Sequence, residues 1–162
     1  MTRTLLIIAI FSLSVTSAFS GEALHVSLTT NILEQTSVRL DKAGNAQDSD
    51  TLLTYLASNA VITVSFPENP EIKRIVFSKE TYATHLAHIR SRTRDVSIRR
   101  LTTEFKIAAD GQSATATSMF RQTATDKDTG QTFASTGKQV SEIRLIDGVP
   151  KATKIDATLT YE

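Results

Sequence analysis

Hydrophobic residues recur every three or four positions in the first part of the chain, which is the spacing of one face of a helix. Across residues 23–42 this spacing is carried by Leu24, Leu28, Ile32, Leu33 and Leu40. The polar run AGNAQDSD then ends the pattern. Asp48 or Ser49 can cap a second, short helix, because short polar side chains accept hydrogen bonds from the first free amides of a helix.

The next segment predicts two short strands followed by a helix. Residues 60–66 (AVITVSF) and 72–77 (IKRIVF) are rich in β-branched and apolar side chains, and PENPE turns the chain between them. Ser78 can cap a helix over residues 79–92, whose buried face would contain Tyr82, Leu86 and Ile89. Phe77, just before the cap, can pack on Tyr82 as a hydrophobic staple.

From Asp95 onward the hydrophobic period changes from three or four residues to two, which predicts strands. Four consecutive antiparallel strands are expected near residues 95–109, 112–125, 131–146 and 149–161. Asp110-Gly111 and Asp147-Gly148 are typical of two-residue hairpin turns. Strands of this length twist and coil, so the sheet is expected to curl around the N-terminal helices.

One slip in the alternation predicts a β-bulge. Val96 and Ile98 share one parity, whereas Leu101, Thr103, Phe105 and Ile107 share the other. An extra residue at Arg99-Arg100 would place both sets on one side of the sheet and bend the strand. The alternative is a strand that ends there and restarts.

Residues 1–20 are predicted to be a signal peptide. Arg3 is their only charge, the apolar run 5–13 is too short to span a bilayer, and Ala18 and Ser20 fit cleavage before Gly21. The alternative is an uncleaved membrane anchor. We therefore expect an exported, periplasmic or secreted protein, with no stable membrane span after cleavage and one domain at residues 21–162.

Composition narrows the choice of partners. The chain has 18 Lys and Arg against 17 Asp and Glu, so removing Arg3 leaves 17 of each and no net charge. A neutral chain lacks the positive field that nucleic-acid binding needs, so no nucleic-acid partner is expected. The chain has no cysteine, which leaves no disulfide and no lipid attachment site of the bacterial lipoprotein kind.

The basic cluster Arg90–Arg100 contains five arginines: Arg90, Arg92, Arg94, Arg99 and Arg100. It could attract an anionic ligand, a lipid head group or an acidic protein surface. The competing interpretation is a solvated helix end, where cations are favoured by the helix dipole.

The order of elements, with helices and a short hairpin followed by a long meander, predicts an α+β fold with a curved antiparallel sheet. The stretches DSDTLLTYLASNAVITV and IVFSKETYATHL, with the closing hairpins, resemble the nuclear transport factor 2-like superfamily. That superfamily includes ketosteroid isomerases and polyketide cyclases. The resemblance implies a cone, in which the curved sheet wraps a helix and leaves a pocket at its open end.

The resemblance to ketosteroid isomerases also implies a catalytic carboxylate on the first strand, directly before a proline. In this chain that position is Phe66, followed by Pro67, and phenylalanine cannot accept a proton. We therefore identify no catalytic residue and lean toward a protein that is not an enzyme.

A ligand pocket, if the cone has one, would be lined by Tyr55, Phe66, Tyr82, His85 and Phe105. No cofactor and no metal are expected: His85 and His88 lie one helical turn apart, but no motif supplies further metal ligands. The favoured function is a non-catalytic domain binding a small apolar ligand or a protein partner. The alternatives are a diverged lyase or isomerase using Tyr55, Tyr82 and His85, and an envelope assembly protein that forms a homodimer through its sheet.

Overall fold

A computed structural model of the chain describes residues 27–67, 71 and 74–162. The predicted signal peptide at residues 1–20 and Leu24 of the first predicted helix lie outside the described residues. The helices are α1 (Thr30–Asn45), α2 (Ser49–Thr54) and α3 (Lys79–Arg92), and the strands are β1 (Leu56–Ser65), β2 (Arg74–Ser78), β3 (Thr93–Ile107), β4 (Ser113–Asp126), β5 (Thr132–Ile146) and β6 (Val149–Tyr161).

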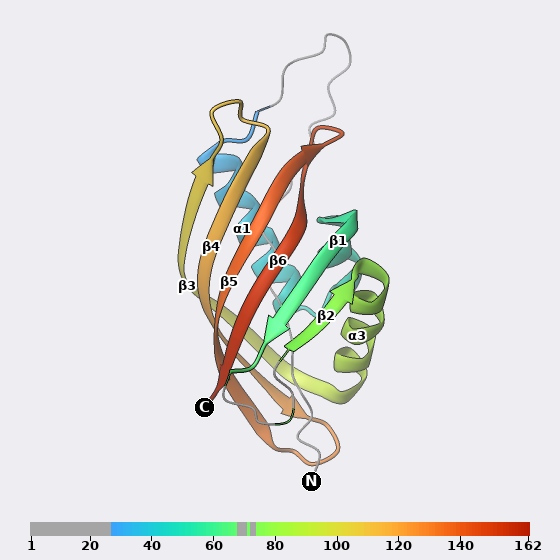
Figure 1. The fold of residues 1–162 in the computed structure, drawn as a ribbon. Helices are drawn as coiled ribbons and strands as arrows, with labels where there is room; N and C mark the ends of the chain where they lie inside the picture. The colour runs from blue at the N-terminus through green and yellow to red at the C-terminus, as the bar shows by residue number, and fades with distance from the viewer. Residues whose placement is uncertain (1–26, 68–70, 72–73) are drawn as a thin grey trace.

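The strands form one curved, unclosed sheet in the order β2-β1-β6-β5-β4-β3 (Figure 1). All neighbouring strands are antiparallel except β1 and β6, which are parallel. Helix α1 lies behind the long strands β3–β6, and α3 packs beside β1 and β2. This arrangement confirms the predicted α+β fold with a curved sheet around N-terminal helices. None of the helices in the described part of the chain combines the length and hydrophobicity needed to cross a bilayer.

The caps of α2 and α3 are those predicted from the sequence, whereas the first helix begins later than predicted. Asp48 caps α2 through a bond from the Thr51 amide, and Ser78 caps α3 in a capping box with Thr81. The staple is confirmed, since the rings of Phe77 and Tyr82 lie 5.7 Å apart. Helix α1, predicted over residues 23–42, begins only at Thr30 within the described residues and continues to Asn45.

The four long strands begin and end within two residues of their predicted positions. Asp147 and Gly148 both have positive φ, at 53° and 72°, as the predicted two-residue turn requires. The same prediction is wrong at Asp110-Gly111, where only Gly111 has positive φ (66°) and β3 already ends at Ile107. The Asp110 carboxylate instead accepts a hydrogen bond from the Gln112 amide at 2.9 Å and closes a longer turn.

The predicted bulge in β3 is present one residue later than expected. The register shifts between Arg100 and Thr102, so Leu101 is the extra residue, and its side chain is exposed. A second shift lies between Arg94 and Ser97. Both irregularities bend β3 toward the helices, because a bulge increases the local twist of a strand.

Helix α1 covers part of the free edge of β3. The side-chain amide of Asn45 accepts a hydrogen bond from the Ile98 amide at 2.6 Å and donates one to the Ile98 carbonyl at 3.2 Å. The asparagine therefore takes the place that a neighbouring strand would occupy at this point of the edge.

The concave face of the sheet is built from small residues where the helices approach it. The buried small residues on this face are Ala114, Ala116, Ala124, Gly137, Ala152 and Ala157. Residue 137 is a glycine because there is no space for a side chain: a Cβ there would lie 2.4 Å from the Phe120 ring and 2.7 Å from Leu159. Small side chains let helices and aromatic rings fill the cone closely.

Candidate functional site

The strand register shows which side chains share the concave face. One row crosses the whole sheet: Phe105, Ala116, Ser141, Ile155, Ile62 and Phe77 are successive cross-strand partners. Neighbouring strands lie about 4.8 Å apart, so five steps separate Phe105 from Phe77 by roughly 24 Å along the curved sheet. Phe105 therefore lies at the opposite edge from the predicted site residues on α3.

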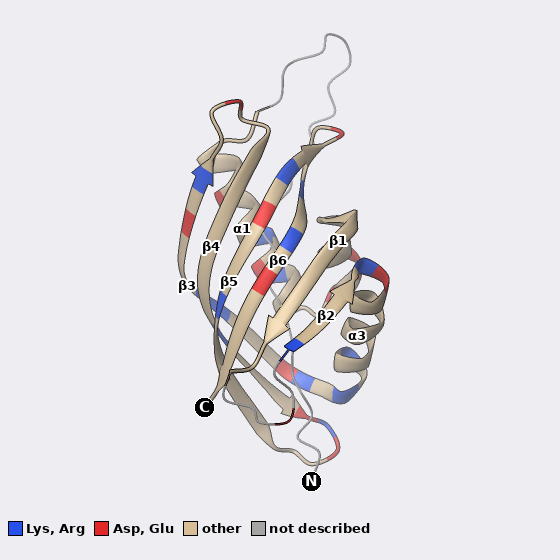
Figure 2. Ribbon diagram, viewed as in Figure 1, with Lys and Arg blue, Asp and Glu red and all other residues tan. Residues whose placement is uncertain are grey.

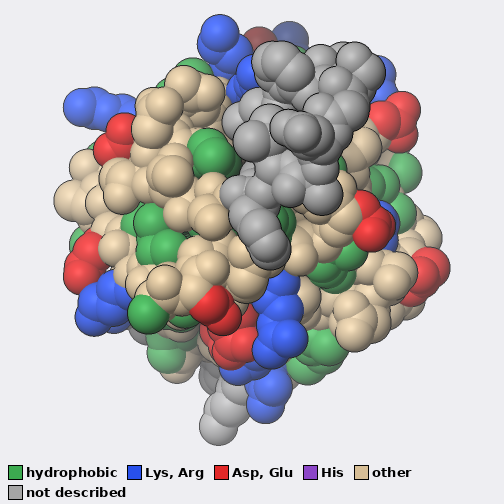
Figure 3. Space-filling model, turned by 90° about the horizontal axis from the view of Figure 1, so that it is seen from above, with side chains coloured by type: hydrophobic (Ala, Val, Ile, Leu, Met, Phe, Trp, Pro, Cys, Tyr) green, Lys and Arg blue, Asp and Glu red, His purple; other side chains and the backbone are tan. Residues whose placement is uncertain are grey.

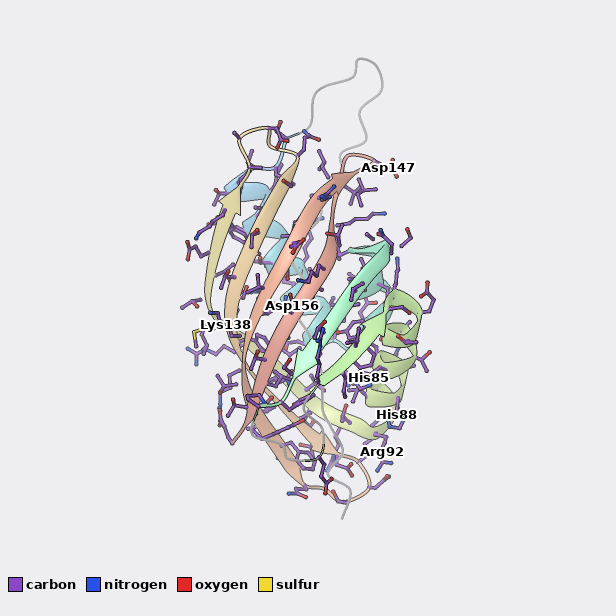
Figure 4. The ribbon with its side chains drawn as sticks, viewed as in Figure 1. His85, His88, Arg92, Lys138, Asp147 and Asp156 are labelled. Carbon is purple, nitrogen blue, oxygen red and sulfur yellow. The ribbon has the colours of Figure 1, made fainter. Side chains whose placement is uncertain are left out.

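Two of the predicted site residues form an aromatic cluster on α3 and β2. The ring of His85 lies 5.0 Å from that of Phe77 and 6.4 Å from that of Tyr82. Tyr82 is fully buried, His85 is half-buried, and His88 is exposed further along the helix (Figure 4). Among the residues the structure describes, no group of three or more His, Cys, Asp or Glu side chains could hold a metal ion.

Phe66 lies apart from that cluster, at the end of β1. Its side chain is 1% exposed and stacks on Tyr161 of β6, with ring centroids 6.0 Å apart and 9° between the planes. The position where the resemblance implies a carboxylate is thus an aromatic contact between two strands.

Polar side chains lie beside this contact on the concave face. Gln122, Ser135 and Tyr161 are successive cross-strand partners on β4, β5 and β6, and we call them the polar row. Gln122 is 0% and Ser135 2% exposed, and the Gln122 amide donates to the Ser135 hydroxyl at 2.8 Å. Polar groups inside an otherwise apolar cone reduce stability unless each finds a partner.

The Tyr161 hydroxyl is buried and has no hydrogen-bond partner among the described residues. Burial raises the pKa of Tyr161 to about 12, because removal of water disfavours the charged phenolate. A neutral hydroxyl group, free to donate or accept one hydrogen bond, therefore faces the interior next to Ser135.

None of the three residues of the polar row was predicted from the sequence as a site residue. The sequence feature that indicates the position of Gln122 is the alternation along β4. Ala114, Ala116, Ser118 and Phe120 are all buried, and Gln122 is the next residue on the same face. Arg121 points outward and pairs with Glu162, which lowers the pKa of Glu162 to about 2 through the hydrogen bond and the charge of the guanidinium.

Tyr55, another of the predicted site residues, ends α2 at the start of β1. Its side chain is buried, and its carbonyl accepts a hydrogen bond from the Ala152 amide at 2.8 Å. The contact ties α2 to β6.

The basic cluster Arg90–Arg100 does not form one positive surface. Arg92 pairs with Asp126 at the end of β4 and with Asp128 of the β4–β5 loop, and Arg94 pairs with Asp95. Arg100 points inward and makes a two-pronged ion pair with Asp41 of α1, at 2.7 and 3.2 Å. Along the strands of the sheet, positive and negative residues are likewise interspersed (Figure 2).

Two hollows are defined by the described residues. A narrow one of about 10 Å³ lies between the three helices, lined by Gly44, Gln47, Ser49, Leu52, Leu86, Ile89 and Arg90. This volume suits at most one water molecule. An open groove of about 510 Å³ lies between α2 and α3, lined by Ser49, Asp50, Leu53, Ala83, Ala87, Arg90 and Ser91. The polar row lines neither of these two hollows.

Replacing Tyr161 by phenylalanine is expected to raise the free energy of unfolding by about 1 kcal/mol, since it removes a buried hydroxyl that has no hydrogen-bond partner among the described residues. Because Tyr161 ionises near pH 10 in the unfolded chain and only near pH 12 in the folded one, its titration leaves stability unchanged below about pH 10 and lowers it as the pH rises through about 12. Urea unfolding should therefore show a smaller loss of stability between pH 9 and pH 12 in the variant. Tyr55→Phe is the matched control and should not gain stability. Equal stability and equal pH dependence of Tyr161→Phe and the wild type would contradict a buried, unpartnered hydroxyl.

No protein-family model matches the chain, and no curated protein matches it in sequence. Solved structures of the same shape are numerous. A conserved protein of Planctomyces limnophilus superposes with a TM-score of 0.67 at 15% identity, covering 80% of this chain and 94% of that one. A hexachlorocyclohexane dehydrochlorinase of Novosphingobium barchaimii has a TM-score of 0.59 at 14% identity, covering 75% and 80%. A ketosteroid isomerase-like protein of Erwinia carotovora has a TM-score of 0.53 at 15% identity, covering 73% and 85%.

Proposed function

The chain has the cone-shaped fold of the nuclear transport factor 2-like superfamily, and we propose that it is a non-catalytic domain that binds a small, largely apolar ligand inside the cone. The observation that carries the proposal is the polar row, with the unpartnered hydroxyl of Tyr161 beside the buried ring of Phe66. The ligand is an apolar molecule with one hydrogen-bonding group, such as a carbonyl or hydroxyl oxygen.

Phe66 supports a role without catalysis. It stands where the resemblance to ketosteroid isomerases implies a general base, and neither its ring nor the Gln122 side chain can take up a proton at neutral pH. Ser135 donates or accepts hydrogen bonds but is a weak base without a partner. These groups orient a ligand and do not activate it.

Entry of a ligand requires Tyr161 to move. The register of β1 with β6 ends at Ser65 and Thr158, so the last residues of β6 pair with β5 alone. Leu159, Thr160 and Tyr161 are therefore held along one edge only. Rotation of the Tyr161 ring away from Phe66 opens the apolar interior and presents its hydroxyl to the incoming oxygen.

Two fluorescent probes test the proposal. Prodan, an aryl ketone, and diphenylhexatriene, a hydrocarbon, are each titrated into the wild type, Tyr161→Phe and the matched control Tyr55→Phe. Saturable binding of both probes is expected, with prodan about two- to tenfold weaker in Tyr161→Phe only, because one neutral hydrogen bond is lost. The hydrocarbon should bind all three proteins equally. Failure of both probes to bind would overturn the proposal.

A protein partner is the second candidate. The open groove between α2 and α3 has a volume of about 510 Å³, which is enough space for side chains of another protein. A partner protein would also fit a chain exported to the periplasm or beyond, as the predicted signal peptide suggests.

A diverged lyase is the third candidate, because one structural neighbour is a dehydrochlorinase. Its basis in this chain is the contact between Tyr82 and His85. Loss of a measured lyase activity in His85→Gln, with the fold intact, would favour this candidate over the first two.

A further inference from the structure

One side of α3, away from the sheet, carries a stripe of small residues between two charges. Ala83 and Ala87 lie four residues apart and line the groove against α2, with Arg90 near one end. At 100° per residue, Glu80 falls within the same stripe, three residues before Ala83. Tyr82, Leu86 and Ile89 instead face the core, so the stripe is a second, separate face of the helix. The helix itself lies at the side of the molecule, beside β2 (Figure 1).

Both charges are available for a partner. Glu80, Ala87 and Arg90 are exposed, and neither Glu80 nor Arg90 has an ion-pair partner among the residues the structure describes. The Glu80 carboxylate is held in place by a 2.8 Å hydrogen bond from the Ser78 hydroxyl at the helix cap. The carboxylate is therefore fixed near the start of α3, and the guanidinium stands near its end.

The spacing of these residues is self-complementary. When two copies of α3 run antiparallel about a two-fold axis at position 85, residue 83 faces residue 87 of the other copy and residue 80 faces residue 90. Each small residue then meets a small residue, and each Glu80 meets an Arg90. Small residues allow two helix axes to approach to about 8 Å. A closed two-fold contact uses the same surface on both copies, as this stripe does.

We propose that the chain forms a homodimer through α3, with the Ala83–Ala87 stripes in contact and Glu80 of each copy paired with Arg90 of the other. Leu53 of α2, which is half-buried on the groove wall, packs against the incoming helix. A contact made by one helix of 14 residues is smaller than the roughly 1,200 Å² of a stable interface, so the dimer is weak.

The outer face of the sheet offers a less suitable surface for the same association. Lys154 pairs there with Glu142 at 3.8 Å and with Asp156 at 2.7 Å, so a partner would have to displace these ion pairs or bury them. At the end of the molecule that is seen from above, hydrophobic side chains also form small separate groups among polar ones, on the part of the surface not covered by grey atoms (Figure 3). The homodimer through the sheet stays a prediction, and the experiment below separates it from the α3 dimer.

Charge reversal tests the proposal by sedimentation of the full chain over a range of protein concentrations. Glu80→Arg and Arg90→Glu are each expected to weaken the dimer about tenfold, since two attractive pairs become two repulsive ones. The double variant E80R/R90E restores the pairs with reversed sign and should recover wild-type association. Arg90 also faces the acidic start of α2, so recovery in the double variant is the decisive result.

Cross-linking supplies a second measurement, because the chain contains no cysteine of its own. A mixture of Ala83→Cys and Ala87→Cys proteins should form disulfide-linked dimers on oxidation, because residue 83 faces residue 87 of the other copy. Each variant alone should form few such dimers. A protein that stays monomeric throughout would overturn the proposal. So would a dimer that survives both single charge reversals, which would point to the sheet.

Discussion

Gly137→Ala is expected to lower the free energy of unfolding by about 2–3 kcal/mol. The new methyl group would lie 2.4 Å from the tip of the Phe120 ring and 2.7 Å from a Leu159 methyl group, so the core must shift to admit it. Alanine also restricts the unfolded chain, which stabilises the protein by up to about 1 kcal/mol, but the overpacking is the larger effect. Urea unfolding of wild type and variant measures the difference.

A compensating substitution controls for other causes. Phe120→Leu removes the atoms nearest to the new methyl group and alone should destabilise the core. The double variant G137A/F120L should be less destabilised than the sum of the single variants, since the two residues share one contact. Additive effects would mean that Phe120 does not fix the glycine at this position.

Arg100→Met is expected to lower the free energy of unfolding by about 2–3 kcal/mol. Arg100 is 12% exposed and holds both carboxylate oxygens of Asp41, at 25% exposure, while also donating to the Ser118 hydroxyl at 2.9 Å. Its removal leaves a largely buried carboxylate without its cation, and the partial exposure of Asp41 keeps the loss below that of a fully buried pair. The result would show that this ion pair anchors α1 to the sheet.

Two comparisons sharpen the Arg100 result. The double variant D41L/R100M should recover most of the lost stability, because neither charge remains. Arg121→Met breaks the exposed pair with Glu162 and should change stability by less than about 1 kcal/mol. Equal losses at Arg100 and Arg121 would contradict an inward-facing anchor.

Local patterns in the sequence were sufficient to predict the helices α2 and α3 and the four long strands. Ser78 and Asp48 cap their helices through bonds within three residues, and the alternation of β3–β6 reports which face is buried. The prediction of a two-residue turn at Asp110-Gly111 was wrong because the same residue pair occurs in several turn types. Here the Asp110 carboxylate, in place of a backbone carbonyl, accepts the hydrogen bond from the Gln112 amide.

The candidate site was harder to predict from the sequence than the fold, because its residues are distant from one another along the chain. Phe66 and Tyr161 are adjacent only because β1 and β6 pair in parallel, a contact that no turn signal announces. In the sequence Tyr161 is one aromatic among several, and nothing assigns Gln122 to a face of the sheet until the register of β4 with β5 is known. Phe105 lies on the concave face, but at the opposite edge of the sheet from the predicted site residues on α3.

The central claim is that the polar row inside the cone binds a small apolar molecule. Native mass spectrometry of the purified chain after exposure to a lipid extract tests it most directly. The account predicts one retained molecule per chain, released from Tyr161→Phe at lower collision energy than from the wild type. Protein that remains at its bare mass after every extract would contradict the claim and leave a protein partner as the function to pursue.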